Sequence, residues 1–338
     1  MKQAFVPEAL VISYRDVPMP EAGPGDLILK VARIGICGSD LHVFKGKHPL
    51  VSFPLVQGHE FSGYVHAMGR GVKGFRVGDL VAVQPAVGCG KCRGCAVKAV
   101  NQCRNLSFIG GNLTGGGSEY FRVPQTQVIR IPAGVDVDEA AMTEPLAVAV
   151  HAVRKIPYIR GKTIVVAGSG TIGNLVAQTA RYYGAGGVLV VERNPFRRET
   201  AARLGFQTID PDDGPPEETI AALTADTEVQ AAFECVGHGD PLNLCIRVVE
   251  RGGHVIVLGV YSNAVQTEMI LVQDKETRVL GSLMYVWNDY REAVRLMRLS
   301  KIDLKILQTH HFPLDRWEEG YKILMERPDE SIKVLIDV

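Results

Sequence analysis

The sequence predicts an α/β protein of two domains, one built on a doubly wound parallel sheet and the other mainly of β-strands. The chain has 338 residues, which is more than one hydrophobic core usually serves. Up to about residue 130, short β-like runs are broken by Gly and Pro, a pattern typical of a largely antiparallel, partly barrel-like unit. The middle of the chain alternates strand-like and helix-like segments, which indicates βαβ units on a parallel sheet.

The first domain is predicted to contain strands in the β-like runs at 26–36, 61–69, 79–87 and 128–132. Residues 139–156 then read as a helix, which we expect to be interrupted at Pro145 because proline disrupts a helix interior.

The middle of the chain begins with a buried-strand run at 162–170, which ends in glycine. Residues 171–185 follow with apolar or weakly polar residues at helical spacing. One more helix and three more strands are predicted here, the helix at 196–206 and the strands at 187–192, 229–237 and 252–260.

The last part of the chain reads as two helices and a final strand, at 289–301, 314–327 and 332–338. The simplest organisation inserts a nucleotide-binding domain into the β-rich domain. The expected boundaries are 1–147 for the first part of the β-rich domain, 148–282 for the nucleotide-binding domain and 283–338 for a return segment.

The charge balance and the hydropathy pattern exclude several function classes. Lys plus Arg and Asp plus Glu both number 37, so nothing supports nucleic-acid binding. The first residues show no apolar run behind a basic stretch, and no run of about 18 apolar residues occurs. We therefore expect a cytoplasmic protein that crosses no membrane and acts on a small molecule.

A glycine-rich turn of the form G-x-G-x-x-G stands between a predicted strand and a predicted helix; it contains Gly168, Gly170, Thr171, Ile172 and Gly173. Its glycines permit the bend, the approach of a pyrophosphate and close helix–strand packing, and the free N–H groups of the helix bind phosphate. The pattern therefore predicts a dinucleotide site. The alternative is a plain glycine turn beside a surface glutamate.

The choice of dinucleotide depends on the end of the next predicted strand. Glu192 stands there and can accept hydrogen bonds from the adenosine ribose, and its charge would repel a 2′-phosphate. NAD is therefore favoured over NADP. Arg193 follows directly and works against this preference, because an arginine can pair with the 2′-phosphate.

Four of the seven cysteines lie close together, as Cys89, Cys92, Cys95 and Cys103. Four thiolates at this spacing can close a tetrahedral shell around zinc, and such a closed site holds a loop in shape without doing chemistry. A redox-active cluster, incidental free thiols and an iron–sulfur cluster are the alternatives.

A second set of donors mixes sulfur, nitrogen and oxygen. Cys37 follows a predicted strand, the pair His59-Glu60 opens another, and Glu144 begins a helical stretch. A catalytic zinc uses such a set and leaves one position open for water or substrate. Taken singly, the cysteine reads as a small core residue and the His-Glu pair as a surface pair.

Together these motifs resemble the zinc-containing medium-chain dehydrogenase/reductase family, the family of the zinc alcohol dehydrogenases. Five motifs stand in that family's order and spacing over essentially the whole length: CGSDLH, GHE, the four-cysteine group, EPLAV and GSGTIG. EPLAV, NDY and THHFPL are most similar to the sorbitol (polyol) dehydrogenase branch, which shares much of this pattern with L-idonate and galactonate dehydrogenases. The resemblance implies a Rossmann domain and a GroES-like catalytic domain with a structural-zinc lobe.

The resemblance implies roles for the mixed donor set. Cys37 and His59 would bind the catalytic zinc, Glu60 would be a ligand or near-ligand, and Glu144 would hold the remaining position directly or through water. Which glutamate binds stays open. The zinc would act as a Lewis acid toward an alcohol, and the nicotinamide would accept the hydride.

In this family a hydroxyl and a histidine at the positions of Ser39 and His42 relay the released proton through the cofactor ribose. Ser39 is also a candidate helix cap. The resemblance further implies cofactor contacts, with Arg197 on the adenine or ribose side and a second group around the nicotinamide: Cys235, Leu258, Gly259, Val260, Leu283, Met284 and Tyr285.

One departure bears on the substrate. Sorbitol dehydrogenases carry an Arg-Tyr pair where this chain has Tyr285-Val286, and the missing guanidinium removes a fork of donors suited to hydroxyls or carboxylates. Sorbitol itself is therefore in doubt. His48, Phe53 and Trp287 are candidate pocket walls, with a core role as the alternative for each.

The predicted function is that of an NAD-linked zinc dehydrogenase that interconverts a secondary alcohol (a polyol, sugar or sugar acid) and its ketone, with one catalytic and one structural zinc. An amino-alcohol dehydrogenase, acting for example on L-threonine, is one alternative. A non-catalytic dinucleotide-binding regulatory protein is another, which the intact ionisable set disfavours. The family also implies a homodimer or homotetramer, and the strand-like region 254–260 and 279–285 could pair sheets across a two-fold axis.

Overall fold

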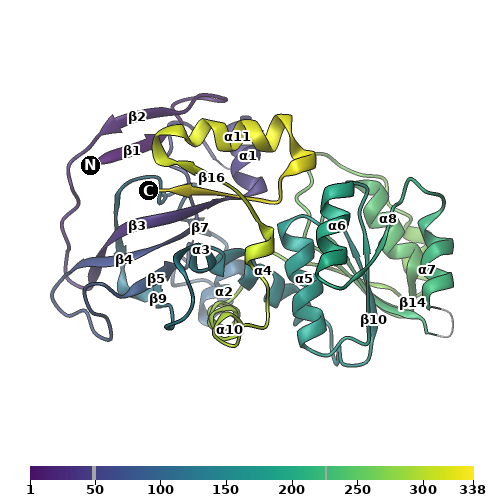
Figure 1. The fold of residues 1–338 in the computed structure, drawn as a ribbon. Coiled ribbons are helices and arrows are strands. Elements are labelled where there is room, and N and C mark those ends of the chain that lie inside the picture. Colours follow the sequence, from purple (N-terminus) through teal and green to yellow (C-terminus); the bar gives the residue numbers. More distant parts are fainter. Residues whose placement is uncertain (48–50, 225–226) are drawn as a thin grey trace. The chain divides into compact units, whose positions relative to one another are not determined.

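The computed structural model describes residues 1–47, 51–224 and 227–338, and these form two compact units (Figure 1). Unit 1 comprises residues 1–147, 285–300 and 308–338, and unit 2 comprises residues 148–284 and 301–307. The boundary at 147 falls inside helix α4 (Thr143–Val153).

The return segment departs from the prediction at 301–307, which belongs to unit 2. Gln178 explains why, because its side chain accepts a hydrogen bond from the Asp303 N–H at 2.7 Å and donates one to the Asp303 carbonyl at 3.1 Å. Leu304 and Leu307 are buried as well, so this short stretch packs as part of unit 2.

Unit 1 is mainly β-structure, as the sequence predicted. Its largest sheet has the order β16-β17-β3-β4-β5-β9, with β8 also paired to β3. The strands of this sheet are β3 (Asp26–Ile36), β4 (Glu60–Met68), β5 (Leu80–Val83), β8 (Tyr120–Pro124), β9 (Val128–Arg130), β16 (Gln308–Pro313) and β17 (Lys333–Asp337). Two small two-stranded antiparallel sheets pair β1 (Lys2–Phe5) with β2 (Ser13–Asp16), and β6 (Ala86–Val87) with β7 (Ser107–Phe108).

The long strand β3 organises this unit. Its first half pairs with β8, its second half pairs with β17, and β4 lies along its other side. All but one of these pairings in the sheet are antiparallel, β16 with β17 being parallel. The C-terminal strand of the chain therefore lies directly beside the strand that leads to Cys37.

The helices of unit 1 are α1 (Gly38–Phe44), α2 (Arg93–Ala96), α3 (Val137–Ala141), α4, α10 (Trp287–Arg298) and α11 (Trp317–Glu326). The interruption predicted at Pro145 is wrong, because the break between α3 and α4 falls at Met142. Pro145 lies in the first turn of α4, where a backbone N–H would have no partner inside the helix and proline is tolerated.

Unit 2 is built on one six-stranded sheet whose order is β12-β11-β10-β13-β14-β15, with every pairing parallel. The strands are β10 (Thr163–Ala167), β11 (Gly187–Val191), β12 (Gln207–Ile209), β13 (Val229–Glu234), β14 (Val249–Val257) and β15 (Arg278–Gly281). The helices around them are α5 (Thr171–Tyr182), α6 (Pro195–Arg203), α7 (Pro216–Thr224), α8 (Gly239–Val248) and α9 (Met269–Asp274) (Figure 1). The doubly wound α/β class is therefore confirmed.

The strand order of unit 2 reverses between β10 and β13, since the chain moves outward to β11 and β12 before it returns to β13. Open α/β sheets bind ligands beyond the carboxyl ends of the strands at such a switch point. The glycine turn after β10 lies at this edge. Among the described residues, no helix combines the length and apolar character that a membrane crossing requires.

Candidate functional site

Three candidate zinc ligands meet at the end of strand β3. Cys37 directly follows β3, and Glu60 is the first residue of β4, where it pairs with Gly35 of β3. Ligand atoms of Cys37, His59 and Glu60 all lie within 4.8 Å of one another. A thiolate, an imidazole and a carboxylate form a donor set that suits zinc, and three protein ligands leave a position open.

His59 is oriented by Asp40, a buried residue of α1. The Nδ1 atom of His59 lies 3.2 Å from Oδ1 of Asp40, while Oδ2 of Asp40 accepts a hydrogen bond from the N–H of Cys37 at 3.0 Å. Burial opposes the charged imidazole, but Asp40 and, to a smaller extent, Cys37 together raise the pKa of His59 well above its usual value. With Nδ1 directed to Asp40, Nε2 is the nitrogen that a metal would use.

Helix α1 begins at this site, and its cap differs from the expectation. Cys37 is the N-cap residue and forms a capping box with Asp40, so the predicted alternative role of Ser39 as the cap is wrong. The reason is that the helix starts two residues earlier than a Ser39 cap would require, at Gly38. Ser39 and His42 both lie within α1 and are half-buried, one helical turn apart.

Glu60 is held from the opposite side by Lys333 of strand β17. The Lys333 ammonium lies 2.5 Å from Oε2 of Glu60 and donates a second hydrogen bond to the Ile36 carbonyl at 3.0 Å. Gly35 provides the space, because a Cβ at that position would lie 2.2 Å from Oε2 of Glu60. The Glu60 carboxylate is therefore fixed between two strands.

Glu144 lies near enough for His59 and Glu60 to affect its pKa, but it is not part of the group whose ligand atoms all lie within 4.8 Å of one another. Burial raises the pKa of Glu144 to about 7, with a further upward effect of Glu60, while His59 acts in the opposite direction. Tyr285 is completely buried, and burial and Glu144 together raise its pKa well above the usual value. Its hydroxyl has no hydrogen bond of good geometry among the described residues. The buried Tyr285 side chain therefore lies close to Glu144 within unit 1.

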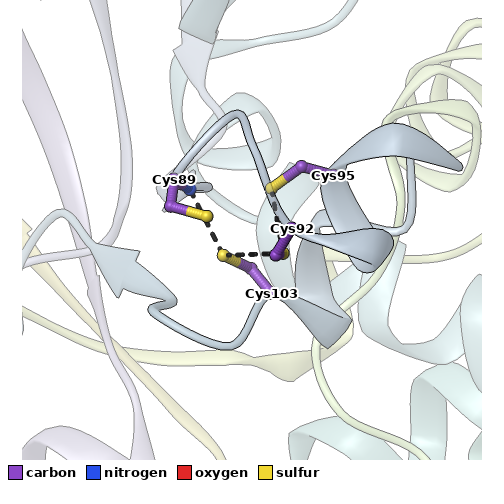
Figure 2. A group of neighbouring side chains, drawn as sticks. All are labelled: Cys89, Cys92, Cys95 and Cys103. Carbon is purple, nitrogen blue, oxygen red and sulfur yellow. Dashed lines mark hydrogen bonds between the residues drawn. The ribbon is translucent and has the colours of Figure 1, made fainter.

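The four clustered cysteines form a second candidate metal site (Figure 2). Their sulfur atoms lie within 4.8 Å of one another and face a common space. The Cys95 N–H is the main cause that lowers the pKa of Cys92 to about 6, while burial raises the pKa of Cys95. All seven cysteines of the chain are free. Four free thiols that converge in this way fit a closed zinc shell and leave no open position.

Of the three candidate pocket-wall residues, Phe53 and Trp287 lie among the described residues and His48 does not. Phe53 is half-buried and packs against the core of unit 1, and Trp287 is half-buried at the start of α10, where its ring stacks on Tyr290 at 5.5 Å. Both observations favour the structural alternative. His48 lies outside the described residues.

The glycine turn of unit 2 joins β10 to α5. Gly168 has a φ of +96°, Gly170 caps the helix, and a Cβ on Gly173 would lie 1.8 Å from the Gly168 carbonyl oxygen. Glycine is therefore required at the first and third positions, for the bend and for the packing. Thr171 and Ile172 open α5, and the N-terminal turn of a helix is a site where phosphate groups bind.

Glu192 lies just beyond β11 and is 9% exposed. Its carboxylate accepts hydrogen bonds from the Ser169 N–H at 2.6 Å and from the Asn194 N–H at 2.9 Å. Arg193 is exposed and lies 3.3 Å from Asp212. The negative charge predicted beside the glycine turn is therefore in place, while the neighbouring arginine is directed to an acidic partner.

The remaining predicted cofactor residues lie mostly at one edge of unit 2. Cys235 follows β13, and Leu258, Gly259 and Val260 follow β14. Arg197 lies in α6, and Leu283 and Met284 follow β15. Tyr285 separates from this group, because the structure assigns it to unit 1.

Comparison with known proteins identifies the family. Residues 23–133 match the alcohol dehydrogenase GroES-like domain, and residues 171–298 match the zinc-binding dehydrogenase family. L-Galactonate-5-dehydrogenase of Escherichia coli (strain K12) is 32% identical over 332 residues, which are 98% of this chain and 96% of that protein. The chain belongs to the zinc-binding dehydrogenases.

Two further proteins show how closely this dehydrogenase follows the family. Sorbitol dehydrogenase of Bacillus subtilis (strain 168) is 30% identical and covers 99% of this chain and 97% of its own. A zinc-binding dehydrogenase of Sinorhizobium meliloti 1021, solved with bound NADP, has a TM-score of 0.92 at 33% identity, over 100% of this chain and 99% of that one. The resemblance inferred from the motifs is thereby confirmed, as are the fold and the class of enzyme, an oxidoreductase that uses zinc and a nicotinamide cofactor.

Sequence reasoning missed three residues that shape the candidate metal site at the end of β3. Asp40 lies within the CGSDLH motif, and its position three residues after Cys37 could have suggested a partner for a ligand. Gly35 and Lys333 gave no signal, because their relation to Glu60 depends on the pairing of β3 with β4 and β17.

Proposed function

We propose that this dehydrogenase interconverts a secondary alcohol of a polyol, sugar or sugar acid with the corresponding ketone, using NAD and one catalytic and one structural zinc. The observation that carries the proposal is the convergence of Cys37, His59 and Glu60 within 4.8 Å at the end of β3. The relatives named for L-galactonate and sorbitol support this substrate class.

In the proposed site, Cys37 and His59 hold the metal, and either Glu60 or Glu144 supplies the third protein ligand. A zinc ion bound there supplies Lewis acidity that favours deprotonation of an alcohol, and nicotinamide supplies the hydride acceptor. Asp40 keeps His59 in the tautomer whose Nε2 is free. Lys333 neutralises Glu60, so the donor set carries less net negative charge.

Release of the alcohol proton requires a path through the protein. Ser39 follows Cys37 by two residues in α1, and His42 lies one turn further along the same helix. We propose that the Ser39 hydroxyl accepts the proton while it passes its own to the imidazole of His42, which hands a proton on toward solvent. Tyr285, whose buried hydroxyl interacts with Glu144, is a candidate positioning residue for that carboxyl.

We propose NAD as the preferred cofactor because Glu192 places a nearly buried carboxylate beside the glycine turn. Its charge would repel the 2′-phosphate of NADP, and Asp212 competes for Arg193. Glu192→Gln should raise the use of NADP relative to NAD by about tenfold, since it removes one repulsive charge. An unchanged ratio of kcat/KM values for the two cofactors would contradict this assignment.

The deciding experiment is a substrate screen followed at the nicotinamide absorbance, with NAD and NADP in parallel and with total zinc measured. Polyols, sugar acids and L-threonine should all be present, because L-threonine 3-dehydrogenase of Vibrio cholerae is 28% identical to this chain. Preferred oxidation of L-threonine would favour the amino-alcohol alternative. A zinc-loaded protein that oxidises no alcohol on the panel would favour a regulatory role.

We also propose a homodimer or homotetramer. Strand β15 is the edge of the parallel sheet, and its Val279 and Leu280 are each 39% exposed. An unpaired edge with apolar side chains is suited to pairing with a second copy. Light scattering after size exclusion tests this, and a monomer at micromolar concentration would contradict it.

A further inference from the structure

Glu234 is a completely buried carboxylate at the end of strand β13. Its Oε1 atom accepts hydrogen bonds from the N–H groups of Val236 and Gly237, both at 2.7 Å. Its Oε2 atom accepts one from the Tyr261 hydroxyl at 2.9 Å. No cationic side chain among the described residues forms an ion pair with it. Three donors therefore face one acid, an arrangement that suits an ionised carboxylate, which only accepts.

The same residue connects two loops. The backbone carbonyl of Glu234 accepts hydrogen bonds from the N–H groups of Leu258 and Gly259, at 2.8 and 3.1 Å. Through its side chain and its backbone, Glu234 thus holds residues 235–237, which follow β13, against residues 258–261, which follow β14. Both loops leave the carboxyl ends of parallel strands, where open α/β sheets bind their ligands.

The two loops touch at their backbones. A Cβ on Gly259 would lie 2.1 Å from the Gly237 nitrogen and 2.5 Å from Oε2 of Glu234. Gly237 has a φ of +83°, and a Cβ there would lie 2.5 Å from the Val260 carbonyl oxygen. Glycine is therefore required at both positions for this close approach, and the Glu234 carboxylate lies at the junction of the two loops.

Tyr261 completes this junction. Burial, and then the Glu234 carboxylate, raise the pKa of Tyr261 far above its usual value, so its hydroxyl remains a donor. The His238 carbonyl is a second acceptor at 3.4 Å, but the contact with Glu234 is shorter. The hydroxyl hydrogen is therefore directed to Glu234.

We propose that Glu234 is a positioning residue for the nicotinamide half of the cofactor, which holds the backbone of residues 235–237 and 258–260 in the conformation that receives the nicotinamide ring. This inference rests on the proposed function and on the expectation that Cys235 and residues 258–260 lie around the nicotinamide. The adenosine and pyrophosphate half depends on another part of unit 2, the glycine turn and Glu192. Loss of Glu234 should therefore weaken one half of the cofactor site and spare the other.

Titration calorimetry on the zinc-loaded full-length enzyme tests this with NADH and with ADP-ribose, which lacks the nicotinamide. Glu234→Ala leaves three buried donors without an acceptor. We expect it to lower the affinity for NADH by at least about tenfold and the affinity for ADP-ribose by less than about twofold. Glu234→Gln keeps one oxygen for the two N–H groups, so we expect a loss of about threefold for NADH only. Tyr261→Phe removes one donor and should resemble Glu234→Gln.

Glu199→Gln, which removes an exposed charge on α6, is the matched control and should change neither affinity. If Glu234→Ala does not fold, as judged by its zinc content and thermal midpoint, then Glu234→Gln and Tyr261→Phe decide the question. An unchanged ratio of NADH to ADP-ribose affinity in these variants overturns the inference, whether both affinities stay at the wild-type value or both fall equally. A wild-type enzyme that binds neither ligand overturns the proposed function and this inference with it.

Discussion

The Nζ atom of Lys333 lies 2.5 Å from Oε2 of Glu60, and the two side chains are 2% and 1% exposed. The residues are 273 positions apart in the chain and meet because the C-terminal strand β17 pairs with β3. A buried ion pair is costly to assemble but more costly to break, because removal of one partner leaves an uncompensated charge. Lys333 therefore stabilises the charged form of Glu60.

Replacement of Lys333 should destabilise the fold strongly. Lys333→Met leaves the Glu60 carboxylate buried without a cation, and we expect the free energy of unfolding to fall by about 3–5 kcal/mol. Urea denaturation followed by circular dichroism measures this. The double variant Lys333→Met/Glu60→Gln should recover part of the loss, because it removes the unpaired charge. Equal stability of the single variant and the wild type would show that the pair contributes nothing.

Asp40 should determine how tightly the catalytic zinc is held. Asp40→Asn replaces the carboxylate that lies 3.2 Å from Nδ1 of His59, and with it the partner that keeps Nε2 free for the metal. We expect the affinity of the catalytic site for zinc to fall by about 10–100-fold. Competition with a chromophoric chelator gives the affinity of each site. The four-cysteine site serves as the internal control, since its affinity should not change.

Glu144 should make the stability of the zinc-free protein depend on pH. Its pKa is raised to about 7 in the folded chain, mainly by burial, so folding favours the protonated acid. Compared with Glu144→Gln, the protonated Glu144 carboxyl contributes to the stability of the fold. This contribution is fully present below the ordinary pKa of about 4.5 and is lost as pH rises through about 7. The unfolding free energy of the wild type minus that of Glu144→Gln should therefore fall by on the order of 1–3 kcal/mol from pH 4.5 to pH 8.

Denaturant titrations of chelator-treated protein at several pH values measure this difference. A difference that stays constant, or that grows with pH, would mean that the Glu144 carboxyl is charged in the folded protein at neutral pH. The same titrations on Glu199→Gln, an exposed glutamate, should show no such trend.

The two candidate zinc sites should respond differently to loss of one cysteine. Cys37→Ser should abolish turnover and reduce the catalytic zinc, while the thermal midpoint changes little, because the buried neighbours of Cys37 remain in place. Cys89→Ser should lose the structural zinc and lower the thermal midpoint, because the lobe from 89 to 103 has little else to hold it. Metal analysis and thermal unfolding report both results. Equal collapse of the two variants would contradict the division into catalytic and structural sites.

Much of the fold could be read from local patterns. The strand at 26–36 was predicted with its observed bounds, because its sequence is mostly apolar and is bounded by turn residues. The βαβ alternation and the glycine turn also depend on neighbouring residues alone. The break at Met142 was not predicted, because the proline at 145 is tolerated in the first turn of α4 and so does not mark the end of a helix. The assignment of 301–307 to unit 2 was not predicted either, because it depends on a contact between Asp303 and Gln178, which are 125 residues apart.

By itself the sequence determined the class of protein, the alternation of strands and helices in the middle of the chain and the donor types of two candidate zinc sites, because each of these is carried by residues close in the chain. The four cysteines span 15 positions, and their spacing alone implies a common metal. Only the tertiary structure decided which side chains support the ligands. Asp40 on His59, Lys333 on Glu60 and Glu234 between two loops are contacts set by strand pairing and burial, which leave no periodic signal in the sequence.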